Sequence, residues 1–176
     1  MRKLKIYIAT SLDGYIADHN GNIEWLTGFP NPEQTDYGYA DFLAGIDTTL
    51  MGYKTYQDVL KLSETFPYPG LANYIFSRDK SHQDTEFVTF VKEEAGAFVS
   101  RLKSLPGKDI WLIGGGELNA AILEHDLVDE MIIHTMPVVL GAGRSVFAGI
   151  PMEKTFGLES VKTYSSGVVE ARYTRS

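Results

Sequence analysis

The sequence contains no cysteine among its 176 residues. This absence excludes disulfide frameworks, cysteine nucleophiles, zinc ribbons and cysteine-ligated clusters. The chain also has no apolar run long enough to cross a membrane, and its first residues lack the charged and apolar pattern of a signal peptide. We therefore expect a cytoplasmic protein with no membrane segment.

The chain contains fewer basic than acidic residues. The chain has 16 Lys and Arg against 23 Asp and Glu, which gives a net charge of −7. Nucleic acids and anionic membrane surfaces attract basic faces, so we expect neither as the main partner. With 44% hydrophobic and 22% charged residues, and with no linker, low-complexity tract or internal repeat, the sequence predicts a single domain over residues 1–176.

Metal-ligand patterns are missing too. Of the four histidines, no two have the spacing of metal ligands. The segment 18–22 resembles the start of a calcium loop, but Ile23 occupies the position that requires glycine and Phe29 the position of the last carboxylate. We predict no metal site, and we expect His134, within a strand pattern, to be a packed residue rather than a base.

The order of apolar and polar residues predicts alternating strands and helices followed by strands only. Strands are predicted over 4–9, 48–51, 73–76, 87–90, 109–113 and 130–137, helices over 31–44, 55–62, 93–105 and 117–124, and a terminal hairpin over 156–164 and 168–174. A long loop is expected over 11–22. The predicted fold is α/β: a mixed, mostly parallel sheet with helices on both faces and a C-terminal antiparallel hairpin.

The most distinctive local feature is a run of three glycines, Gly114-Gly115-Gly116, between a buried strand and a helix. Glycine allows a phosphate to approach the backbone, and the start of a helix offers unpaired N–H groups. The usual dinucleotide fingerprint is absent, because its third glycine would fall at Asn119. A tight turn without a ligand is the alternative interpretation.

Two further strands end in polar and basic residues. Lys54 and Thr55 follow Gly52 at the start of a predicted helix, and Ser77 and Arg78 follow the next strand. Ligands of open α/β sheets bind at the carboxyl ends of the strands, so these residues are expected near the glycine run. Together the three strand ends favour a dinucleotide, although each cation alone is typical of a solvated surface.

Several segments in this order resemble the dihydrofolate reductase superfamily. They are 7–17 (YIATSLDGYIA), Trp25, 50–55 (LMGYKT), 73–77 (NYIFS) and 113–116 (IGGG). The stretch 128–147, with PVVLGAGR at 137–144, is more similar to the riboflavin-biosynthesis branch, the reductase domain of the deaminase-reductase proteins and its small stand-alone relatives. The resemblance covers nearly the whole chain and implies NADPH as hydride donor and often a homodimer.

The resemblance also implies roles for individual residues. The positions that match cofactor-binding positions are Ala9 and Ile16 beside the nicotinamide, Gly52, Lys54 and Thr55 at the phosphates, Ser77 and Arg78 at the 2′-phosphate, and Gly114, Gly115, Gly116, Glu117 and Leu118 around the pyrophosphate. Trp25 and the helix at 36–43 would face the substrate.

The chain departs from the family in two ways. Leu71 and Ala72 follow Pro69-Gly70, where folate reductases carry a basic residue for the glutamate tail, and the cysteine-dependent deaminase domain is absent. We therefore predict an NADPH-dependent reductase of a small planar or heterocyclic substrate. The alternatives are dihydrofolate reduction and a non-catalytic nucleotide-binding module. Arg144 is a candidate for another anion contact, or a loop residue.

Three aspartates are candidates for supplying a proton. Asp36 lies sixteen residues before Gly52, as does the substrate-binding acid of folate reductases, and is expected in the second turn of a helix with a raised pKa. There it would hold a ring nitrogen or pass a proton. Asp41 lies five residues further on, and Asp13 lies in the loop before Gly14.

A homodimer is expected from the late strands. Residues 131–133 (MII) and 137–140 (PVVL) contain more apolar side chains than one face of a sheet requires. A fully internal sheet core is the alternative.

Overall fold

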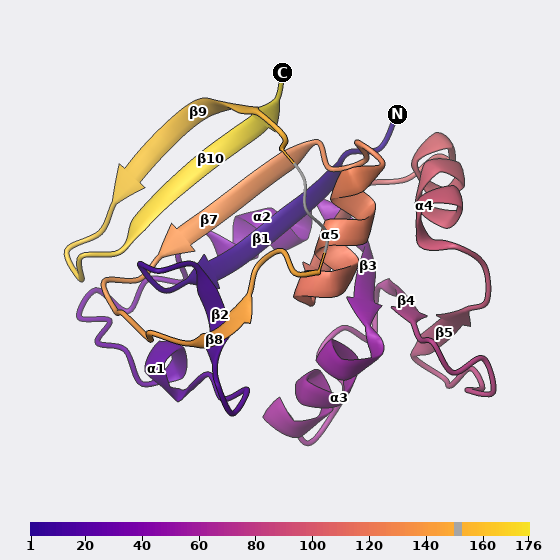
Figure 1. Ribbon diagram of the computed structural model, residues 1–176, viewed down its shortest axis with the longest axis horizontal. Coiled ribbons are helices and arrows are strands. Elements are labelled where there is room, and N and C mark those ends of the chain that lie inside the picture. Colours follow the sequence, from indigo (N-terminus) through magenta and orange to yellow (C-terminus); the bar gives the residue numbers. More distant parts are fainter. Residues whose placement is uncertain (150–152) are drawn as a thin grey trace.

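The computed structural model describes residues 1–149 and 153–176 (Figure 1). Its strands are β1 (Leu4–Thr10), β2 (Tyr15–Asp18), β3 (Ile46–Gly52), β4 (Ala72–Phe76), β5 (Val88–Val91), β6 (Asp109–Gly114), β7 (Glu130–Thr135), β8 (Gly143–Ser145), β9 (Phe156–Thr163) and β10 (Val169–Arg175). Its helices are α1 (Glu24–Thr27), α2 (Tyr39–Ala44), α3 (Tyr53–Leu62), α4 (Ala95–Ser104) and α5 (Gly116–Glu124).

Eight strands form one mixed sheet in the order β5-β4-β3-β6-β1-β7-β10-β9. The strands from β5 to β7 are parallel, whereas β10 runs antiparallel to β7 and to β9. The terminal hairpin closes through Gly167, whose φ of 88° suits a residue without a side chain. The predicted fold class is confirmed.

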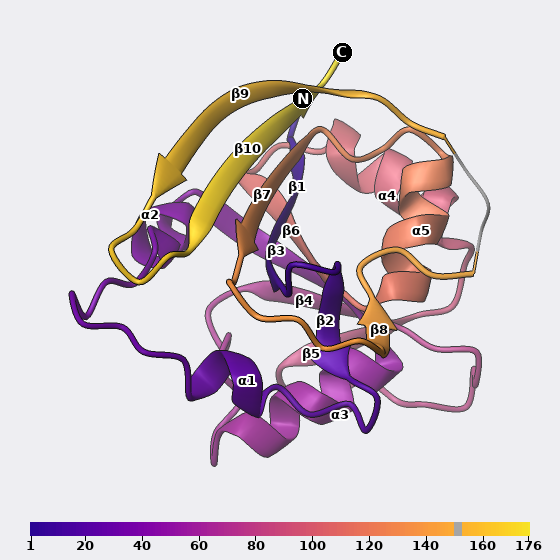
Figure 2. The ribbon, with the colours of Figure 1, turned by 60° about the vertical axis from the view of Figure 1, so that its left-hand side comes forward.

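Helices cover both faces of the sheet (Figures 1 and 2). Leu4 and Ile6 of β1 are fully buried in a cluster with Phe98 of α4 and with Leu118 and Ile122 of α5. Each such side chain contributes about 1.5–3 kcal/mol relative to an exposed one. On the other face Met51 of β3 and Ile75 of β4 pack with Val59 of α3. The alternation of side chains along each strand thus determines which helices pack on each face of the sheet.

The predicted helix over 31–44 is wrong for most of its length. Only Tyr39–Ala44 is helical, and Asn31 instead bonds through its side chain to the backbone of Thr35. Gln34 and Tyr37 have positive φ angles, which a helix does not allow. Because asparagine and proline favour turns as strongly as helix starts, the local signal was ambiguous.

Two short strands and one short helix were also missed. β2 lies inside the predicted loop 11–22 and pairs antiparallel with β8. This small second sheet lies beyond the carboxyl ends of β1 and β7, near α1 (Figure 2). It therefore adds a cover at the edge where ligands are expected.

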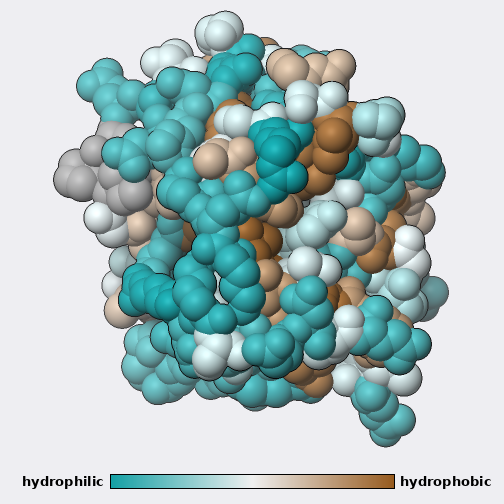
Figure 3. Space-filling model, turned by 90° about the vertical axis from the view of Figure 1, so that its right-hand side faces the viewer, coloured by the Kyte–Doolittle hydropathy of each residue, from teal (hydrophilic) through white to brown (hydrophobic). Residues whose placement is uncertain are grey.

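The apolar residues of β7 do not form an outer face. Met131 and Ile132 are 6% and 1% exposed, because helices and loops cover both sides of this strand. Exposed apolar side chains lie on β9, where Leu158 is 59% and Val161 54% exposed, and in the predicted run 137–140, where Val139 is 67% exposed. On the side of α4, β4 and β5 hydrophilic residues cover most of the surface, with smaller apolar groups between them (Figure 3). Within the described residues, no helix has the length and apolar character needed to span a bilayer.

Candidate functional site

Two helices begin side by side at the carboxyl edge of the sheet. α3 begins directly after β3 with Gly52 as its N-cap, and α5 begins directly after β6 with Gly115 as its N-cap. β3 and β6 are parallel neighbours, with Met51 opposite Gly114. Neither cap residue has a side chain that could accept from the first N–H groups, so both helix starts can bind an anion.

The glycines at these helix starts lie close to one another. A Cβ on Gly52 would lie 3.7 Å from the oxygen of Gly114 and from the nitrogen of Gly115. A Cβ on Gly115 would lie 3.1 Å from Oγ1 of Thr55. The Gly114-Gly115 peptide bond is cis. The predicted residues Gly52, Thr55, Gly114 and Gly115 therefore come together.

Gly116 has a different environment from its neighbours. A Cβ there would collide with the backbone oxygen of Ser145 and lie 3.2 Å from the side chain of Ala148. The segment after β8 also bonds to this turn, because the N–H of Ala148 donates to the oxygen of Gly116. Gly116 therefore permits the segment after β8 to pack closely against the start of α5.

The two predicted cations flank the helix starts. Lys54 is exposed in the first turn of α3, and within the described residues no carboxylate pairs with it. Arg78 forms an ion pair with Glu117 of α5, and both side chains are exposed. Ser77 accepts a hydrogen bond from the N–H of Asp79 at 3.1 Å. Lys54 and Arg78 thus offer positive charge on the outer side of the helix starts.

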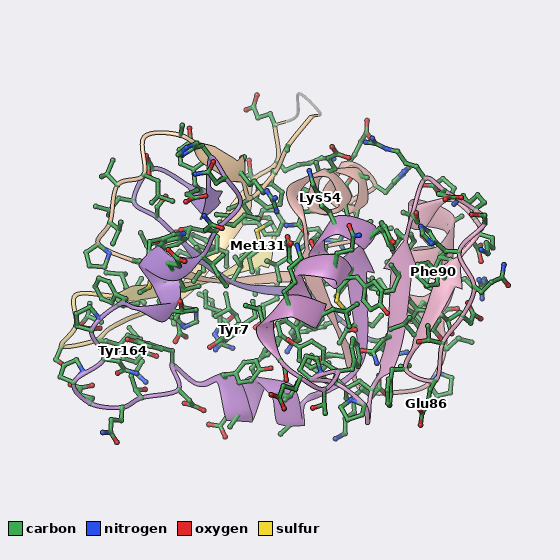
Figure 4. All side chains as sticks on the ribbon, turned by 90° about the horizontal axis from the view of Figure 1, so that it is seen from below. Tyr7, Lys54, Glu86, Phe90, Met131 and Tyr164 are labelled. Atoms are coloured by element: carbon green, nitrogen blue, oxygen red, sulfur yellow. The ribbon has the colours of Figure 1, made fainter. Side chains whose placement is uncertain are left out.

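A second part of the site is a cavity of about 180 Å³ near the carboxyl ends of β1 and β7. Its walls are mainly aromatic and apolar, with one carboxylate and one imidazole. The lining residues are Tyr7, Ala9, Leu26, Asp36, Tyr37, Tyr39, His134, Met136 and Val168. In the view onto this edge, Tyr7 lies between Tyr164 and Lys54 (Figure 4). Apolar and aromatic walls with a few polar groups are typical of the lining of small-molecule sites.

A chain of polar groups lies behind the cavity wall. His134 is 4% exposed, and its Nε2 lies 3.2 Å from the oxygen of Tyr37 and 3.3 Å from Oε2 of Glu170. The hydroxyl of Tyr164 donates to the same Glu170 oxygen at 2.9 Å, and the hydroxyl of Tyr7 donates to the oxygen of Tyr37 at 2.9 Å. The expectation that His134 is packed within a strand is confirmed, but its packing partners are polar.

These contacts shift the ionisation of each group. Burial lowers the pKa of His134, although Glu170 opposes the shift. Burial raises the pKa of Glu170, but the hydrogen bond from Tyr164 and the charges of His134 and Arg172 outweigh it and lower the pKa overall. Burial raises the pKa of the Tyr7 hydroxyl, with a further contribution from Glu170. Near neutral pH we therefore expect a neutral imidazole beside a charged carboxylate.

The predicted raised pKa of Asp36 is wrong. Asp36 precedes α2 instead of lying within a helix, and its carboxylate accepts from the N–H groups of Ala40 and Gly38, at 2.9 Å each. These bonds, that from Ala40 first, lower its pKa. Asp36 does line the cavity, whereas Asp41, exposed on α2, does not.

The carboxylate of Asp13 forms its hydrogen bonds outside the cavity. It accepts from Oγ of Ser11 at 2.6 Å and from the N–H groups of Leu140 and Gly141 at 3.1 and 2.7 Å. The bond from Ser11, followed by those backbone bonds, lowers the pKa of Asp13. Asp13 joins two loops and is not among the residues that line the cavity.

Of the other predicted residues, Ala9 lines the cavity, whereas Ile16 lies in β2 and Trp25 in α1 outside the lining. Trp25 packs on the cluster around Met136, and its buried Nε1 has no hydrogen-bond partner among the described residues. Arg144 pairs with Asp58 of α3 at 2.9 Å, so it is not a contact of the cavity.

The sequence reasoning missed Tyr7, Tyr37 and Glu170 as site residues. Alternation along β1, β7 and β10 places Tyr7, His134 and Glu170 on one face, but it does not show which helix leaves that face open. The usable signal was a glutamate in the final strand, facing inward where an apolar residue is normal.

Sequence comparisons with known proteins find a matching family and two similar proteins. The family model of the RibD C-terminal domain matches residues 2–170. Two proteins of Bacillus subtilis (strain 168), both described as uncharacterized, are similar over nearly their whole length. YwjB is 39% identical over 99% of both chains, and YyaP is 33% identical over 98% of this chain and 94% of its own.

Solved structures share the fold. The crystal structure of a putative riboflavin biosynthesis protein from Shewanella sp. PV-4 has a TM-score of 0.88 and 29% identity, covering 99% of both chains. A diaminohydroxyphosphoribosylaminopyrimidine deaminase/5-amino-6-(5-phosphoribosylamino)uracil reductase from Thermotoga maritima has a TM-score of 0.74 and 15% identity. At 15% identity, that protein shows a common fold alone. This chain spans 57% of its length.

Proposed function

The chain belongs to the family of RibD C-terminal domains, and on that premise we propose that it is an NADPH-dependent reductase. The proposed reaction is hydride transfer to a small planar heterocycle, as in riboflavin-pathway pyrimidine reductases. The observation that carries the proposal is the juxtaposition of two helix starts with an aromatic cavity at one edge of the sheet. Hydride transfer depends mainly on holding two rings in contact, and this edge offers a place for each.

The residues at the helix starts fit the phosphates of a dinucleotide. A side chain on Gly52 would fill the space beside Gly114 and Gly115, which glycine leaves open. Asn119, fully buried, has an Oδ1 without a hydrogen-bond partner among the described residues, and a Cβ on Gly114 would lie 3.3 Å from it. Open space and unpaired N–H groups are typical of a phosphate site, whereas the Asn119 oxygen, an acceptor, would need an N–H or O–H donor of the ligand.

Individual residues would then have defined tasks. Gly52, Thr55 and the run Gly114–Leu118 would hold the pyrophosphate, and Lys54, Ser77 and Arg78 would hold the 2′-phosphate that distinguishes NADPH from NADH. When bound, the cofactor supplies the hydride. Ala9, which lines the cavity, would separate the nicotinamide from the substrate pocket.

The aromatic cavity would hold the substrate. Tyr7, Tyr37 and Tyr39 offer ring faces for a planar heterocycle, and Asp36 offers a carboxylate at the wall. No lysine or arginine is among the lining residues within the described part of the chain. This lining favours a substrate whose reacting ring is uncharged.

The test measures cofactor binding and turnover separately. Fluorescence titration should give tighter binding for NADPH than for NADH. NADPH oxidation should then be followed with dihydrofolate, 7,8-dihydrobiopterin and 5-amino-6-(5-phosphoribosylamino)uracil as acceptors. Binding without oxidation of NADPH by any acceptor would instead support a non-catalytic nucleotide-binding module, and absence of binding would exclude the proposal.

The proposed assembly is a homodimer that pairs through β9. This edge strand is exposed from Gly157 to Thr163, and Leu158 and Val161 present apolar side chains to water. Exposed apolar strands at a sheet edge are unfavourable in a monomer, and burial by a second copy removes that cost.

A further inference from the structure

We propose that His134 is the residue that gives the substrate its proton, and that Glu170 and Tyr164 position it. This inference rests on the proposed function, because a proton is needed only where a hydride is transferred. It replaces the three aspartates that the sequence offered for this task. Its basis is the geometry of the chain of polar groups behind the cavity.

The surroundings of His134 determine which ring nitrogen faces the cavity. Nε2 lies between the backbone oxygen of Tyr37 and Oε2 of Glu170, both of which only accept hydrogen bonds near neutral pH. Nε2 must therefore carry the hydrogen in the neutral ring. Nδ1 has no hydrogen bond within the described residues, while the side chain itself lines the cavity. A ligand in the cavity would meet an imidazole with a free nitrogen.

The pairing of three strands sets the arrangement of polar groups around Nε2. Strand register places His134 of β7 opposite Ala9 of β1 and Glu170 of β10, so the three side chains share one face of the sheet. Glu170 receives a second hydrogen bond from Tyr164 and lies 3.4 Å from the guanidinium of Arg172. Burying an imidazole and a carboxylate usually costs more than an apolar pair of the same size, so such pairs occur where they have a task.

The other acids of the site are already ionised and bonded. Asp36 and Asp13 each accept backbone N–H groups, which stabilises the charged form and leaves no proton to donate near neutral pH. Asp41 does not reach the cavity lining. Among the described residues of the cavity, His134 is the group whose protonation changes closest to neutral pH.

The proposed step conserves atoms and charge. The bound cofactor would supply a hydride to a substrate carbon, and the electron pair of the double bond at that carbon would move to the neighbouring nitrogen or oxygen. His134, neutral in the resting protein, first takes a proton from the solvent onto Nδ1; it then gives that hydrogen to the receiving atom and becomes neutral again. Glu170 stabilises the protonated ring through Nε2, as an acidic partner does in other imidazole acids.

Other charged or titratable groups face this pair from each packed element. They are Tyr7 of β1, Asp36 and Tyr37 before α2, Tyr164 and Lys162 at the end of β9, and Arg172 of β10. Among the charges around the imidazole, those of Glu170 and then Arg172 have the largest effects on the pKa of His134. The protonation of His134 should therefore respond most to its nearest partner, Glu170.

The first test needs no known substrate. NMR of the protein labelled with ¹⁵N-histidine, assigned with His134→Gln, should show the Nε2–H form of His134 above neutral pH. Saturating lumazine, a planar heterocycle with ring N–H groups, should shift the nitrogen signals of His134 and leave those of His125 unchanged. The Nδ1–H form, or His134 signals unaffected up to the solubility of lumazine, would overturn the proposal.

The second test uses turnover with an acceptor that the wild type reduces. His134→Gln should lower kcat about 100-fold or more while the Kd for NADPH stays unchanged, since general acids typically contribute a factor of this order. Glu170→Gln should lower kcat less and move the high-pH limb of the kcat profile, where His134 loses its proton, to lower pH. His125→Gln is the matched control, because His125 also lies beside a glutamate, Glu94, but at the surface.

The outcomes separate the two proposals. If NADPH binds and is oxidised but His134→Gln retains kcat and the wild-type pH profile, His134 is not the proton donor and the proposed function stands. If NADPH does not bind, the proposed function fails, and the NMR test alone decides whether His134 exchanges a proton with a ligand. Glu170→Gln and the wild-type spectra keep both tests usable if His134→Gln does not fold.

Discussion

The guanidinium of Arg78, just after β4, is paired with the carboxylate of Glu117 in the first turn of α5. β4 and β6 flank β3 in the sheet, so this ion pair bridges the region in front of Gly52. Both side chains are largely exposed, at 90% for Arg78 and 71% for Glu117. An exposed ion pair contributes little stability, so a phosphate can replace the carboxylate at small cost.

This pair gives a prediction about cofactor affinity. Glu117→Gln should tighten NADPH binding several-fold, because Arg78 no longer has to leave a carboxylate. Arg78→Ala should weaken NADPH binding about tenfold and leave NADH binding unchanged, since one charge-assisted hydrogen bond to phosphate is lost. Titration of both cofactors measures the effect. Lys61→Ala, which removes an exposed charge at the other end of α3, is the control.

Two glycine substitutions should separate folding from binding. Gly52→Ala leaves the nearest atoms 3.7 Å from the new methyl group, so thermal unfolding should change little while NADPH binding weakens at least tenfold. Gly116→Ala would collide with the oxygen of Ser145 and should lower the free energy of unfolding by about 1–3 kcal/mol. A stable Gly116→Ala variant would show that the segment after β8 is not packed as described.

The sequence was informative where local pattern and tertiary contact agree. Buried strands such as β6 end in glycine and lead into amphipathic helices, so the parallel sheet and the juxtaposition of the two helix starts followed from short segments. The segment 31–44 failed because its helix signals, Asn31 and Pro32, are also turn signals, and tertiary contacts decided between them.

The aromatic cavity and the polar groups behind it depend on residues far apart in the chain. His134 and Glu170 meet only because β7 and β10 pair in one register, and Tyr37 reaches them from an irregular segment. No spacing in the sequence encodes these distances. For the same reason residues 131–133 were expected at a dimer interface, whereas Met131 and Ile132 are buried within the chain.

The dimer proposal predicts a change in mass. Wild-type protein should have the mass of a dimer by light scattering at micromolar concentration, and Leu158→Lys with Val161→Lys should have that of a monomer, because two charges would be buried without partners. Leu62→Lys is the control, since Leu62 is as exposed as Leu158 but lies on α3. A monomeric wild type would contradict the proposal.

Dihydrofolate should be a poor substrate. Leu71 and Ala72 stand at the beginning of β4, where folate reductases carry a cation for the glutamate carboxylate, and an unpaired carboxylate binds weakly. We expect kcat/KM for dihydrofolate to lie below that for 7,8-dihydrobiopterin, which lacks the glutamate tail. Leu71→Arg should reduce the difference. Equal values for the two acceptors in the wild type would contradict this prediction.

His134 should make stability depend on pH in a specific range. Burial holds its pKa in the folded protein below the ordinary value of 6.5, so below that pH the unfolded chain binds a proton that the folded protein does not. Stability present above pH 6.5 is therefore lost as the pH falls toward the pKa of the folded state. The loss from this one group cannot exceed about 1.4 kcal/mol per pH unit.

Substitutions of His134 and Glu170 should change this pH dependence of the free energy of unfolding in opposite directions. Denaturant unfolding between neutral pH and pH 5 should show a smaller loss of unfolding free energy for His134→Gln than for the wild type. The glutamine side chain binds no proton in this range. Glu170→Gln should extend the loss to lower pH, because removing the carboxylate lowers the pKa of His134 further. The carboxylates with lowered pKa values, such as Asp36 and Asp13, lose their contribution mainly below their ordinary value of 3.8 and so act outside this range. A slope for His134→Gln equal to that of the wild type would mean that His134 binds protons equally in both states, and that its burial beside Glu170 does not hold it neutral.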